Sequence, residues 1–432
     1  MIWNKNAECM SREDLEALQI HKLRATVKRM YENIPMYRER MQFSKVKPED
    51  IKDLSDLKRL PFIDKPDLRD HYPYGLFSSP MKDIVRIHGS SGTTGRPVLA
   101  GYTNNDLKLW SEMMARTLTA VGATQDDIVQ IAYGYGLFTG GLGAHQGATE
   151  IGATVVPMSA GNTQRQIMMM RDLQATLLCC TPSYALYLGE TRAEMGLTPD
   201  QIPLRRAALG AEPWSEEMRV RIEQLLGVDA IDIYGLTEIW GPGVAFECLE
   251  KHGMHINEDQ VIAEIVDPDT LEPLPMGSKG ELVLSSVGKE GMPLLRYRTH
   301  DICTLTDEPC SCGRSFVRMN RITGRSDDMI VIRGVNVFPS QVESVLVNIP
   351  GVTPHYLLVV DRVDSTDTLE IRVEVTEEMF SDMIGSMQAL GRQIGEKMKS
   401  TLGISAKIVL VEPKSLPRSE GKSKHVQDNR KI

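Results

Sequence analysis

The sequence lacks any apolar segment that could cross a membrane. No run of about 18 consecutive apolar residues occurs among its 432 residues. The first residues, 1–8, lack the apolar core of a signal peptide. We therefore expect a cytoplasmic protein with no membrane partner.

Positive charge is also in short supply. The chain has 49 Lys and Arg against 58 Asp and Glu, which gives a formal net charge of -9. Because binding to a phosphate backbone requires a basic face, this balance argues against nucleic acid as the main partner. With 41% hydrophobic and 25% charged residues, the composition is that of an ordinary globular protein. The length predicts roughly two or three domains.

Two common patterns are absent as well. Seven cysteines, an odd number in a chain without a signal peptide, argue against a disulfide framework and favour reduced thiols or metal ligands. A Walker A loop requires a glycine, four residues and then Gly-Lys-Ser or Gly-Lys-Thr. The one Gly-Lys-Ser triplet begins at Gly421, and Leu416 stands where the first glycine would be. We therefore expect no nucleotide site of the P-loop type.

A different loop, at 90–97, has the composition of a phosphate cradle. Its glycines permit a turn in which successive N–H groups surround an anion, and its hydroxyls and one cation add further donors. A Ser/Gly-rich surface turn is the alternative that turn chemistry alone leaves open. The residues of the loop that could contact an anion, through side chains or backbone N–H groups, are Ser90, Ser91, Gly92, Thr93, Thr94, Gly95 and Arg96.

Short apolar runs alternate with helical patterns through most of the chain. Helical patterns occupy 12–43, where Pro35 interrupts the helix, and 105–121; apolar runs lie at 129–132, 153–156, 176–180 and 230–233. Such alternation predicts βαβ units around parallel or mixed sheets. Residues 328–432 predict a small α+β unit, with strands at 356–360, 369–375 and 408–411. The fold class is therefore α/β, with a large N-terminal domain and a small, mobile C-terminal α+β domain.

The C-terminal unit also contains an amphipathic helix, whose apolar positions lie on one face and form part of its core. They are Met383, Ile384, Met387, Leu390 and Ile394.

Two loops follow predicted strands, at 208–213 and 234–238. Open α/β sheets bind ligands at the C-terminal ends of their strands, so both loops are expected at a binding site. A carboxylate such as Glu238 can lie beside a triphosphate only if a cation separates the two, and Mg²⁺ is typically held in this way. Considered alone, Glu238 would be interpreted as a surface glutamate, and it is Thr237 and the loop at 90–97 that favour a role at a nucleotide.

Glycines and aromatic residues are interspersed at 133–145. Glycine lets the backbone approach a ligand closely, and Tyr135 and Phe138 offer flat apolar walls. The pattern alone favours a packing device over a pocket for an apolar group, and both readings stay open at this point.

Cysteine and histidine cluster in two places along the chain. Zn²⁺ prefers four thiolate or imidazole ligands in a tetrahedron, and three thiolates with one imidazole form a closed structural set. Our choice of ligands is Cys248, His255, Cys310 and Cys312, with His252 as the spare imidazole. Separate reduced cysteines in two loops are the alternative.

Several of these motifs together resemble those of the adenylate-forming acyl-CoA synthetase superfamily, and most closely its phenylacetate-CoA ligase branch. The matching segments are 87–103, 133–145, 234–238 and 323–343, of which the last is the longest uninterrupted match. Arg96 departs from the family's usual lysine, which keeps the charge but changes its geometry. His300 stands where the family usually has glycine, before Asp301.

The resemblance implies an ATP-dependent acid-thiol ligase. Such an enzyme adenylates a carboxylate with release of pyrophosphate, then transfers the acyl group to CoA with release of AMP. It implies ATP, CoA and Mg²⁺ as ligands, a structural Zn²⁺ at the Cys/His cluster, an arylacetic acid (phenylacetate first) as substrate, and a homodimer. Another aromatic acid (indoleacetate or a benzoate), a carrier-protein acceptor and a non-catalytic nucleotide sensor stay open as alternatives.

The resemblance also assigns roles to individual residues. Lys422 reaches the acyl carboxylate and the α-phosphate, Thr237 contacts the α-phosphate, and Glu238 holds Mg²⁺. The expected ATP and AMP contacts are Ser90, Ser91, Gly92, Thr93, Thr94, Gly95, Gly210, Ala211, Glu212, Pro213, Asp232, Tyr234, Gly235, Asp301 and Arg325. The expected acyl-pocket residues are Lys65, Tyr135, Gly136, Phe138 and Gly141, and the CoA-facing residues are Arg333, Gly334 and Asn336.

The domain boundary is expected in the polar turn that contains Asp327. A polar, charged turn between two apolar patterns is typical of a linker. We therefore predict an N-terminal domain at 1–326 that binds ATP and the acyl group, and a mobile C-terminal domain at 327–432. By resemblance Asp327 is the hinge. A hinge is needed because Lys422 would hinder the thiol of CoA in the second half-reaction.

Overall fold

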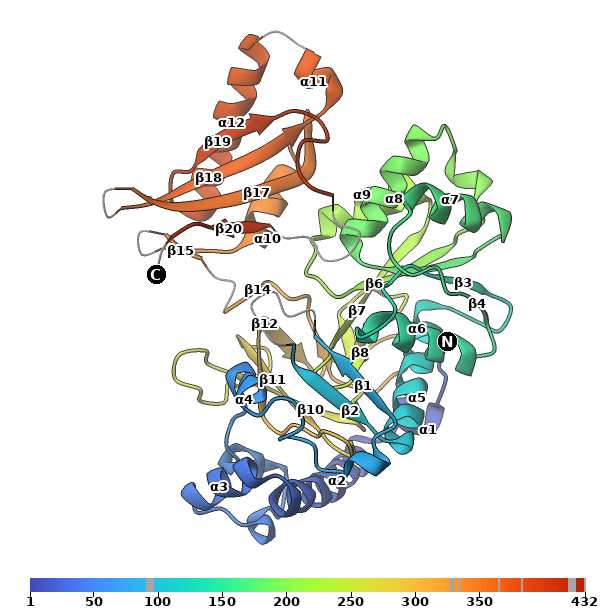
Figure 1. Ribbon diagram of the computed structural model, residues 1–432, viewed down its shortest axis with the longest axis vertical. Coiled ribbons are helices and arrows are strands. Elements are labelled where there is room, and N and C mark those ends of the chain that lie inside the picture. Colours follow the sequence, from blue (N-terminus) through green and yellow to red (C-terminus); the bar gives the residue numbers. More distant parts are fainter. Residues whose placement is uncertain are drawn as a thin grey trace. The chain divides into compact units, whose positions relative to one another are not determined.

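The computed structural model describes residues 1–90, 97–326, 330–332, 335–363, 366–381, 384–418 and 425–430. Contacts divide the chain into two compact units, which are described separately (Figure 1). The first unit comprises Met1–Cys180, Thr198–Ala211 and Val228–Ile322, and the second comprises Thr181–Leu197, Glu212–Gly227 and Thr323–Ile432.

Helices and strands of the first unit alternate in its middle part and give way to strands towards its end. The helices are α1 (Lys5–Glu8), α2 (Arg12–Asn33), α3 (Pro35–Phe43), α4 (Lys65–Asp70), α5 (Asn104–Val121), α6 (Thr139–Glu150) and α7 (Thr163–Asp172), with short 3₁₀ turns η1 (Pro48–Asp50), η2 (Leu54–Arg59), η3 (Met81–Asp83) and η4 (Pro199–Gln201). The strands are β1 (Arg86–Gly89), β2 (Leu99–Tyr102), β3 (Ile128–Ile131), β4 (Thr154–Val156), β5 (Leu177–Cys180), β6 (Arg206–Gly210), β7 (Asp229–Leu236), β8 (Gly241–Glu247), β9 (Met254–Ile256), β10 (Val261–Val266), β11 (Lys279–Ser286), β12 (Tyr297–Thr306) and β13 (Arg318–Met319).

One long mixed sheet runs through the first unit in the order β10-β11-β12-β13-β9-β8-β7-β6-β5-β3-β4. From β4 to β7 neighbouring strands are parallel, whereas from β7 to β10 they are antiparallel. All residues of β5 are buried, as expected for an inner strand of a parallel sheet. The change of direction at β7 brings loops from both halves of the sheet to its C-terminal end.

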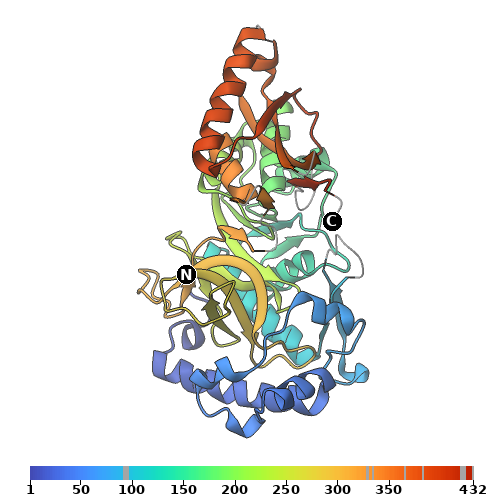
Figure 2. The same cartoon turned by 90° about the vertical axis from the view of Figure 1, so that its left-hand side faces the viewer.

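The helices begin and end where local chemistry dictates. Ser11 caps α2 by accepting a hydrogen bond from the N–H of Asp14, and α2 ends at Asn33 because Ile34 precedes a proline and is extended. Thr103 and Asp106 form a capping box at the start of α5. In both views the blue helices α2 and α3 lie together at one end of the first unit (Figure 1, Figure 2).

The second unit is built around a four-stranded sheet of order β19-β18-β17-β20. Leu358, Val360 and Ile371 of this sheet form a buried core with Ile394 and Met398 of α12. The elements of this unit are α8 (Pro182–Glu194), α9 (Glu216–Leu226), β14 (Gly324–Arg325), β15 (Ile330–Ile332), β16 (Val335–Val337), α10 (Pro339–Leu346), β17 (Val352–Val363), β18 (Thr366–Val375), α11 (Glu377–Ser381), α12 (Ile384–Leu402), β19 (Lys407–Val411) and β20 (Val426–Asp428).

The predicted fold class is confirmed. The apolar runs at 129–132, 153–156, 176–180 and 230–233 correspond to β3, β4, β5 and β7, and the helical pattern at 105–121 is α5. The antiparallel strands β8 to β13 were not predicted from the sequence. The expected hinge Asp327 lies outside the described residues, so the boundary at 326/327 stays a prediction. None of the described helices is long and apolar enough to cross a membrane.

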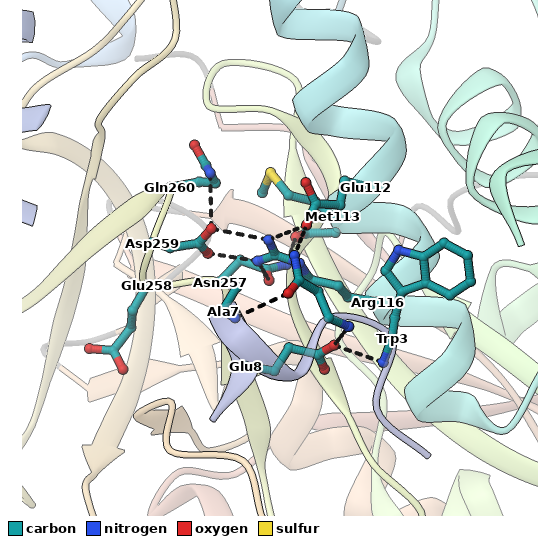
Figure 3. A network of polar contacts seen from close by, with 12 residues as sticks. Trp3, Ala7, Glu8, Glu112, Met113, Arg116, Asn257, Glu258, Asp259 and Gln260 are labelled. Atoms are coloured by element: carbon teal, nitrogen blue, oxygen red, sulfur yellow. Dashed lines mark hydrogen bonds and ion pairs between the residues drawn. The ribbon is translucent and has the colours of Figure 1, made fainter. Parts of the chain in front are cut away.

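A buried ion pair ties α5 to the turn before β10 (Figure 3). The guanidinium of Arg116 donates to both carboxylate oxygens of Asp259, at 2.7 and 3.1 Å, and also to Glu112 at 2.6 Å and Asn257 at 3.2 Å. The side chains of Arg116 and Asp259 are only 2% and 5% exposed. Because each charge has charged or polar partners, part of its desolvation cost is offset in the interior.

Arg116→Met should lower the free energy of unfolding by about 3–5 kcal/mol, because it leaves the buried carboxylate of Asp259 without its partner. Chemical denaturation would measure the change. The matched control is Arg171→Met, since Arg171 pairs with Asp172 on the surface, where the two side chains are 42% and 51% exposed. The control should lose less than about 1 kcal/mol. Equal losses in the two variants would contradict a special contribution from the buried pair.

Candidate functional site

The expected phosphate loop connects the two strands of the β1–β2 hairpin. At its base, the N–H of Ser90 donates to the carbonyl of Val98 at 2.9 Å, and the N–H of Val98 donates to Ser90 Oγ at 3.1 Å. The N–H of Gly89 donates to the carbonyl of Leu137 at 2.8 Å. The start of the loop is therefore fixed beside the segment that carries the aromatic residues. The central members of the loop, Ser91, Gly92, Thr93, Thr94, Gly95 and Arg96, lie outside the described residues.

The aromatic segment forms a wall before α6. The hydroxyl of Tyr135 lies 3.2 Å from His145 Nδ1, and the backbone N–H of Tyr135 donates to Ser159 Oγ at 3.3 Å. Burial raises the pKa of the Tyr135 hydroxyl. At Gly141 a Cβ atom would lie 2.8 Å from the carbonyl oxygen of Gly134, so this position requires glycine.

The segment offers both an apolar surface and a polar end. Phe138 is 47% exposed, directly before the first residue of α6. Gly136 has φ 107°, a left-handed conformation that favours glycine. The predicted acyl-pocket residues Tyr135, Gly136, Phe138 and Gly141 therefore lie in one continuous segment, 135–141, which we call the aromatic wall.

The turn after β7 borders this wall. Thr237 Oγ1 lies 3.4 Å from Oγ1 of Thr139, the first residue of α6. Glu238, next in the turn, is 6% exposed. A Cβ atom at Gly235 would lie 1.9 Å from the carbonyl oxygen of Gly241, so only glycine fits where β7 and β8 meet. The expected α-phosphate and Mg²⁺ residues thus lie at the junction of the parallel and antiparallel halves of the sheet.

Two of the expected nucleotide residues touch across the sheet. The hydroxyl of Tyr234, on β7, donates to Asp301 Oδ2, on β12, at 2.6 Å. Asp301 is 7% exposed. Asp232 lies two residues before Tyr234, where its N–H donates to Glu247 Oε2 at 2.8 Å and its carboxylate lies 3.6 Å from Arg321 Nε. The structure therefore brings Tyr234 and Asp301 into contact, with Asp232 two residues away on the same strand.

Lys65 is attached to this group through its neighbours. Asp64 caps α4, accepts from the N–H of Lys65 at 2.7 Å and lies 2.8 Å from Nε2 of His300. The hydrogen bond from His300 is the main cause that lowers the pKa of Asp64. The preceding residue, Ile63, exchanges two backbone hydrogen bonds with the start of β12. Half-buried Lys65 thus follows a residue that contacts His300, the neighbour of Asp301 in the chain.

The backbone conformation of His300 shows why the family usually has glycine at this position. Its φ is 63°, in the left-handed region where glycine is preferred, which accounts for the glycine that the family usually has there. In this protein His300 adopts the same left-handed backbone conformation, and its imidazole contacts Asp64. The sequence showed the departure but not the contact, because Asp64 and His300 are far apart along the chain.

The remaining expected residues lie elsewhere. Gly210 ends β6 in the first unit, and Ala211, which follows it, has φ 76°. Glu212, Pro213 and Arg325 belong to the second unit, where Glu212 Oε1 accepts from the N–H of Ser183 at 2.7 Å. Asp327, Arg333, Gly334 and Lys422 lie outside the described residues, as does the side chain of Asn336.

The cysteine and histidine residues meet in the first unit. The ligand atoms of Cys248, His255, Cys310 and Cys312 all lie within 4.8 Å of one another. Cys248 Sγ is 3.8 Å from Cys310 Sγ, and Cys312 Sγ is 3.4 Å from His255 Nε2. His252 is exposed and is not part of the group. Hydrogen bonds from Cys248 and His255 lower the pKa of the Cys312 thiol, which favours the thiolate that binds metal.

This donor set fits zinc. Three sulfurs and one imidazole nitrogen match a closed structural site, and Nδ1 of His255 is buried without a hydrogen-bond partner among the described residues. The loop that carries Cys310 and Cys312 is held to α1 by a buried ion pair, in which Arg314 Nε donates to Glu8 Oε2 at 2.6 Å. Glu8 also accepts from the backbone N–H of Trp3 (Figure 3).

Family comparisons define the class of the protein. Residues 9–289 match the family described as AMP-binding enzyme, and residues 334–430 match the AMP-binding enzyme C-terminal domain. The chain thus has the two parts of an adenylate-forming enzyme, in agreement with the fold and with the residues gathered at β7.

Individual relatives narrow the class. The chain is 48% identical over 445 residues, covering 100% of both chains, to a phenylacetate-coenzyme A ligase of Thermus thermophilus. It is 46% identical over 427 residues, covering 98% of this chain and 97% of the relative, to a phenylacetate-coenzyme A ligase of Escherichia coli. The chain therefore belongs to the phenylacetate-CoA ligase family, and the resemblance seen in its motifs is confirmed.

Solved structures agree with this assignment. A 2-hydroxyisobutyryl-CoA ligase in the postadenylation state, in complex with 2-HIB-AMP, has a TM-score of 0.93 at 27% identity, covering 99% of this chain and 92% of that one. The same ligase in the thioesterification state, with 2-HIB-AMP and CoA, has a TM-score of 0.73 at 28% identity, with the same coverage. The protein is accordingly a ligase of the adenylate-forming, acyl-CoA-forming class.

Asp64→Ala should loosen the segment that carries Lys65. The variant loses the cap of α4 and the contact with His300, which costs about 1 kcal/mol locally. Hydrogen exchange of the amides at 63–70 should become about fivefold faster. The control is Asp53→Ala, since Asp53 caps η2 in the same way by accepting from the N–H of Ser55. Unchanged exchange at 63–70 in Asp64→Ala would show that the cap does not hold this segment.

Proposed function

We propose that the protein converts an arylacetic acid, phenylacetate first, into its CoA thioester. ATP and CoA are consumed, and AMP and pyrophosphate are released. The observation that carries the proposal is the contact of Tyr234 with Asp301 at the end of β7, next to the turn of Thr237 and Glu238 and the wall of Tyr135. It occurs in a chain that matches phenylacetate-coenzyme A ligases over its whole length.

In the first half-reaction, a carboxylate oxygen of the acid forms a bond to the α-phosphorus of ATP. The bond from that phosphorus to the bridging oxygen breaks, and pyrophosphate leaves. No general base is needed, because the carboxylic acid is already ionised at neutral pH. Catalysis then consists of positioning the reactants and stabilising the charge that develops on the α-phosphate.

The proposed roles come from the family resemblance, and the contact of Tyr234 with Asp301 supports them. Asp301 accepts hydrogen bonds from the ribose hydroxyls, and Tyr234, oriented by Asp301, packs against the adenine. Thr237 donates to the α-phosphate. Mg²⁺, when bound, would be held by Glu238 and phosphate oxygens and would offset their negative charge. The N–H groups of 90–96 are proposed to bind the phosphates, and Gly210, Ala211 and Asp232 to line the nucleotide site.

The acid is proposed to lie against the aromatic wall, with Lys65 near its adenylate. Tyr135 and Phe138 supply flat apolar surface, while the backbone at Gly136 and Gly141 allows close approach. A flat acid without further charge fits this combination of groups. Other flat aromatic acids fit the same groups, and a panel of acids distinguishes them from phenylacetate.

In the second half-reaction, the sulfur of CoA attacks the carbonyl carbon of the acyl-adenylate and AMP leaves. We propose that Lys422 serves only the first step and that Asp327 is the hinge between domains 1–326 and 327–432. Arg333, Gly334 and Asn336 would then face CoA. The neighbouring ligase has been solved in a postadenylation and a thioesterification state, which supports a two-state cycle in that enzyme. We also propose that the protein forms a homodimer, as the resemblance implies.

The protein should release pyrophosphate from ATP only when phenylacetate is present, and should form phenylacetyl-CoA only after CoA is added. Pyrophosphate release and chromatography of the thioester measure the two steps separately. A panel of indoleacetate, benzoate and aliphatic acids serves as the control for specificity. Pyrophosphate release that does not depend on any acid, or no turnover with phenylacetate while another acid is active, would contradict the proposed substrate.

A variant pair tests the assignment of the catalytic lysine. Lys422→Ala should slow adenylation about 10²–10³-fold, because it removes a cation from the developing charge. Lys424→Ala, which removes an equal charge two residues further on, should retain most of the rate. Adenylate formation at the unaltered rate in Lys422→Ala would refute the role of this residue.

The Cys/His group should hold about one Zn²⁺ per chain. Four protein ligands leave no open position, so we propose that the metal joins the 310–312 loop to β9 and takes no part in the reaction. Elemental analysis should show that Cys310→Ser loses the metal and has a lower melting temperature. Cys9→Ser is the control, because Cys9 is half-buried and lies outside the ligand group. Metal-free protein with an unaltered melting temperature would contradict a structural zinc site in this group.

A further inference from the structure

The loop between β11 and β12 contains a lysine that the proposed mechanism does not use. Lys289 is only 1% exposed. Its ammonium group donates to the carbonyl oxygen of Ile239 at 2.6 Å. It also lies over two aromatic rings, 4.4 Å from the centroid of Tyr102 and 5.3 Å from that of Trp240. This buried cation therefore holds the turn that follows Glu238.

The surroundings of Lys289 partly compensate for the burial of its charge. Burial lowers its pKa to about 8, while the carboxylates of Asp106 and Glu238 act in the opposite direction. The two rings offer their negative faces to the ammonium group. Since an apolar side chain of similar length would fill the same space without this desolvation cost, the retained charge requires an explanation.

The position of Lys289 explains why a charged side chain is buried here. Its neighbours in the chain, Glu290 and Gly291, donate their N–H groups to Asp106 at 2.7 and 2.8 Å. Asp106 is fully buried and also accepts from the N–H of Thr103, with which it caps α5. The loop that carries Lys289 is thus anchored to the start of α5, and the ammonium group reaches from this anchor to the turn after β7.

We propose that Lys289 is a positioning residue for the adenylation half-reaction, because it fixes the turn at Ile239 and so aims Thr237 and Glu238 at the nucleotide. The inference rests on the proposed nucleotide site. The hydrogen bond to Ile239 sets the path of the backbone directly after Glu238. The charge of the ammonium group offsets part of the negative charge that Asp106 and Glu238 bring into the interior.

Two substitutions separate the parts of this role. Lys289→Met keeps the length and removes both the charge and the donor, whereas Lys289→Gln retains a donor for the carbonyl of Ile239. Displacing the turn should slow adenylation about 10²-fold in Lys289→Met, since small misplacements of reacting groups have effects of this size. The affinity for ATP with Mg²⁺, measured by calorimetry without any acid, should fall about tenfold. Lys289→Gln should recover part of both losses.

The decisive readout is the difference between the two half-reactions. Thioester formation from saturating acyl-adenylate and CoA should fall by clearly less than adenylation, no more than about tenfold, because Glu238 and its Mg²⁺ act only while the triphosphate is present, whereas Thr237 still contacts the phosphate of the acyl-adenylate. A merely structural role would slow both half-reactions by the same factor, and that result would overturn the proposal. If Lys289→Met fails to fold, the same comparison is made with Lys289→Gln.

A matched control is available in the same unit. Lys22 is also half-buried and donates to a backbone carbonyl, that of Asp259, at 2.7 Å, but among the described residues no contact joins it to the turn after β7. Lys22→Met should leave ATP affinity and both half-reactions unchanged. Equal ATP affinities in Lys289→Met, Lys22→Met and the unaltered protein would overturn the proposal. The calorimetric comparison needs no acid, so it stays decisive even if phenylacetate proves to be the wrong substrate.

Discussion

Strand β7 is paired in parallel with β6 on one side and in antiparallel fashion with β8 on the other, and the candidate site depends on this change of direction. In a parallel sheet the C-terminal ends of the strands meet at one edge, where the chain must leave for the next crossover. In the antiparallel half the chain turns back at once. The turn of Thr237 and Glu238 lies between these two halves, where Thr237 lies against Thr139 of α6 and Tyr234 of β7 contacts Asp301 of β12.

The candidate site contains several buried carboxylates of its own, apart from any charge that a substrate brings. Asp232, Glu238 and Asp301 are all buried or nearly so, although the ligand proposed for this place is itself a polyanion. Such an arrangement is stable only if each carboxylate has a defined partner. Asp301 accepts from Tyr234, Asp232 lies near Arg321, and Glu238 lies near buried Lys289. The remaining charge is what Mg²⁺ and the expected cations of the phosphate loop and the C-terminal tail would balance.

The sequence allowed the parallel half of the fold to be predicted and candidate residues such as Tyr234, Thr237 and Asp301 to be proposed, because both depend on local patterns. Buried parallel strands appear as short apolar runs, and glycine at positions such as Gly235 reports a backbone approach that excludes a side chain. The antiparallel strands β8 to β13 escaped prediction, since their partners are set by contacts between distant segments. His300 was noticed only as a departure from a pattern. Its contact with Asp64 depends on tertiary structure that no local signal encodes.

Lys289 shows most clearly why some functional residues cannot be found from the sequence. A lysine between Gly288 and Glu290 in a loop would ordinarily be taken for a solvated side chain. Its burial results from three separate segments: β2 supplies Tyr102, α5 supplies Asp106, and the turn after β7 supplies Trp240 and the carbonyl of Ile239.

Two other buried cations, Arg116 and Arg314, likewise join segments that are distant in the chain, but both pair directly with carboxylates in the structural network shown in Figure 3 or beside it. Lys289 instead directs its one short hydrogen bond at the backbone of the proposed catalytic turn. A cation bound to a carbonyl rather than to a carboxylate keeps its charge available to its surroundings, and here those surroundings include Glu238. This difference in partners distinguishes a buried charge that stabilises the fold from one that also positions the site.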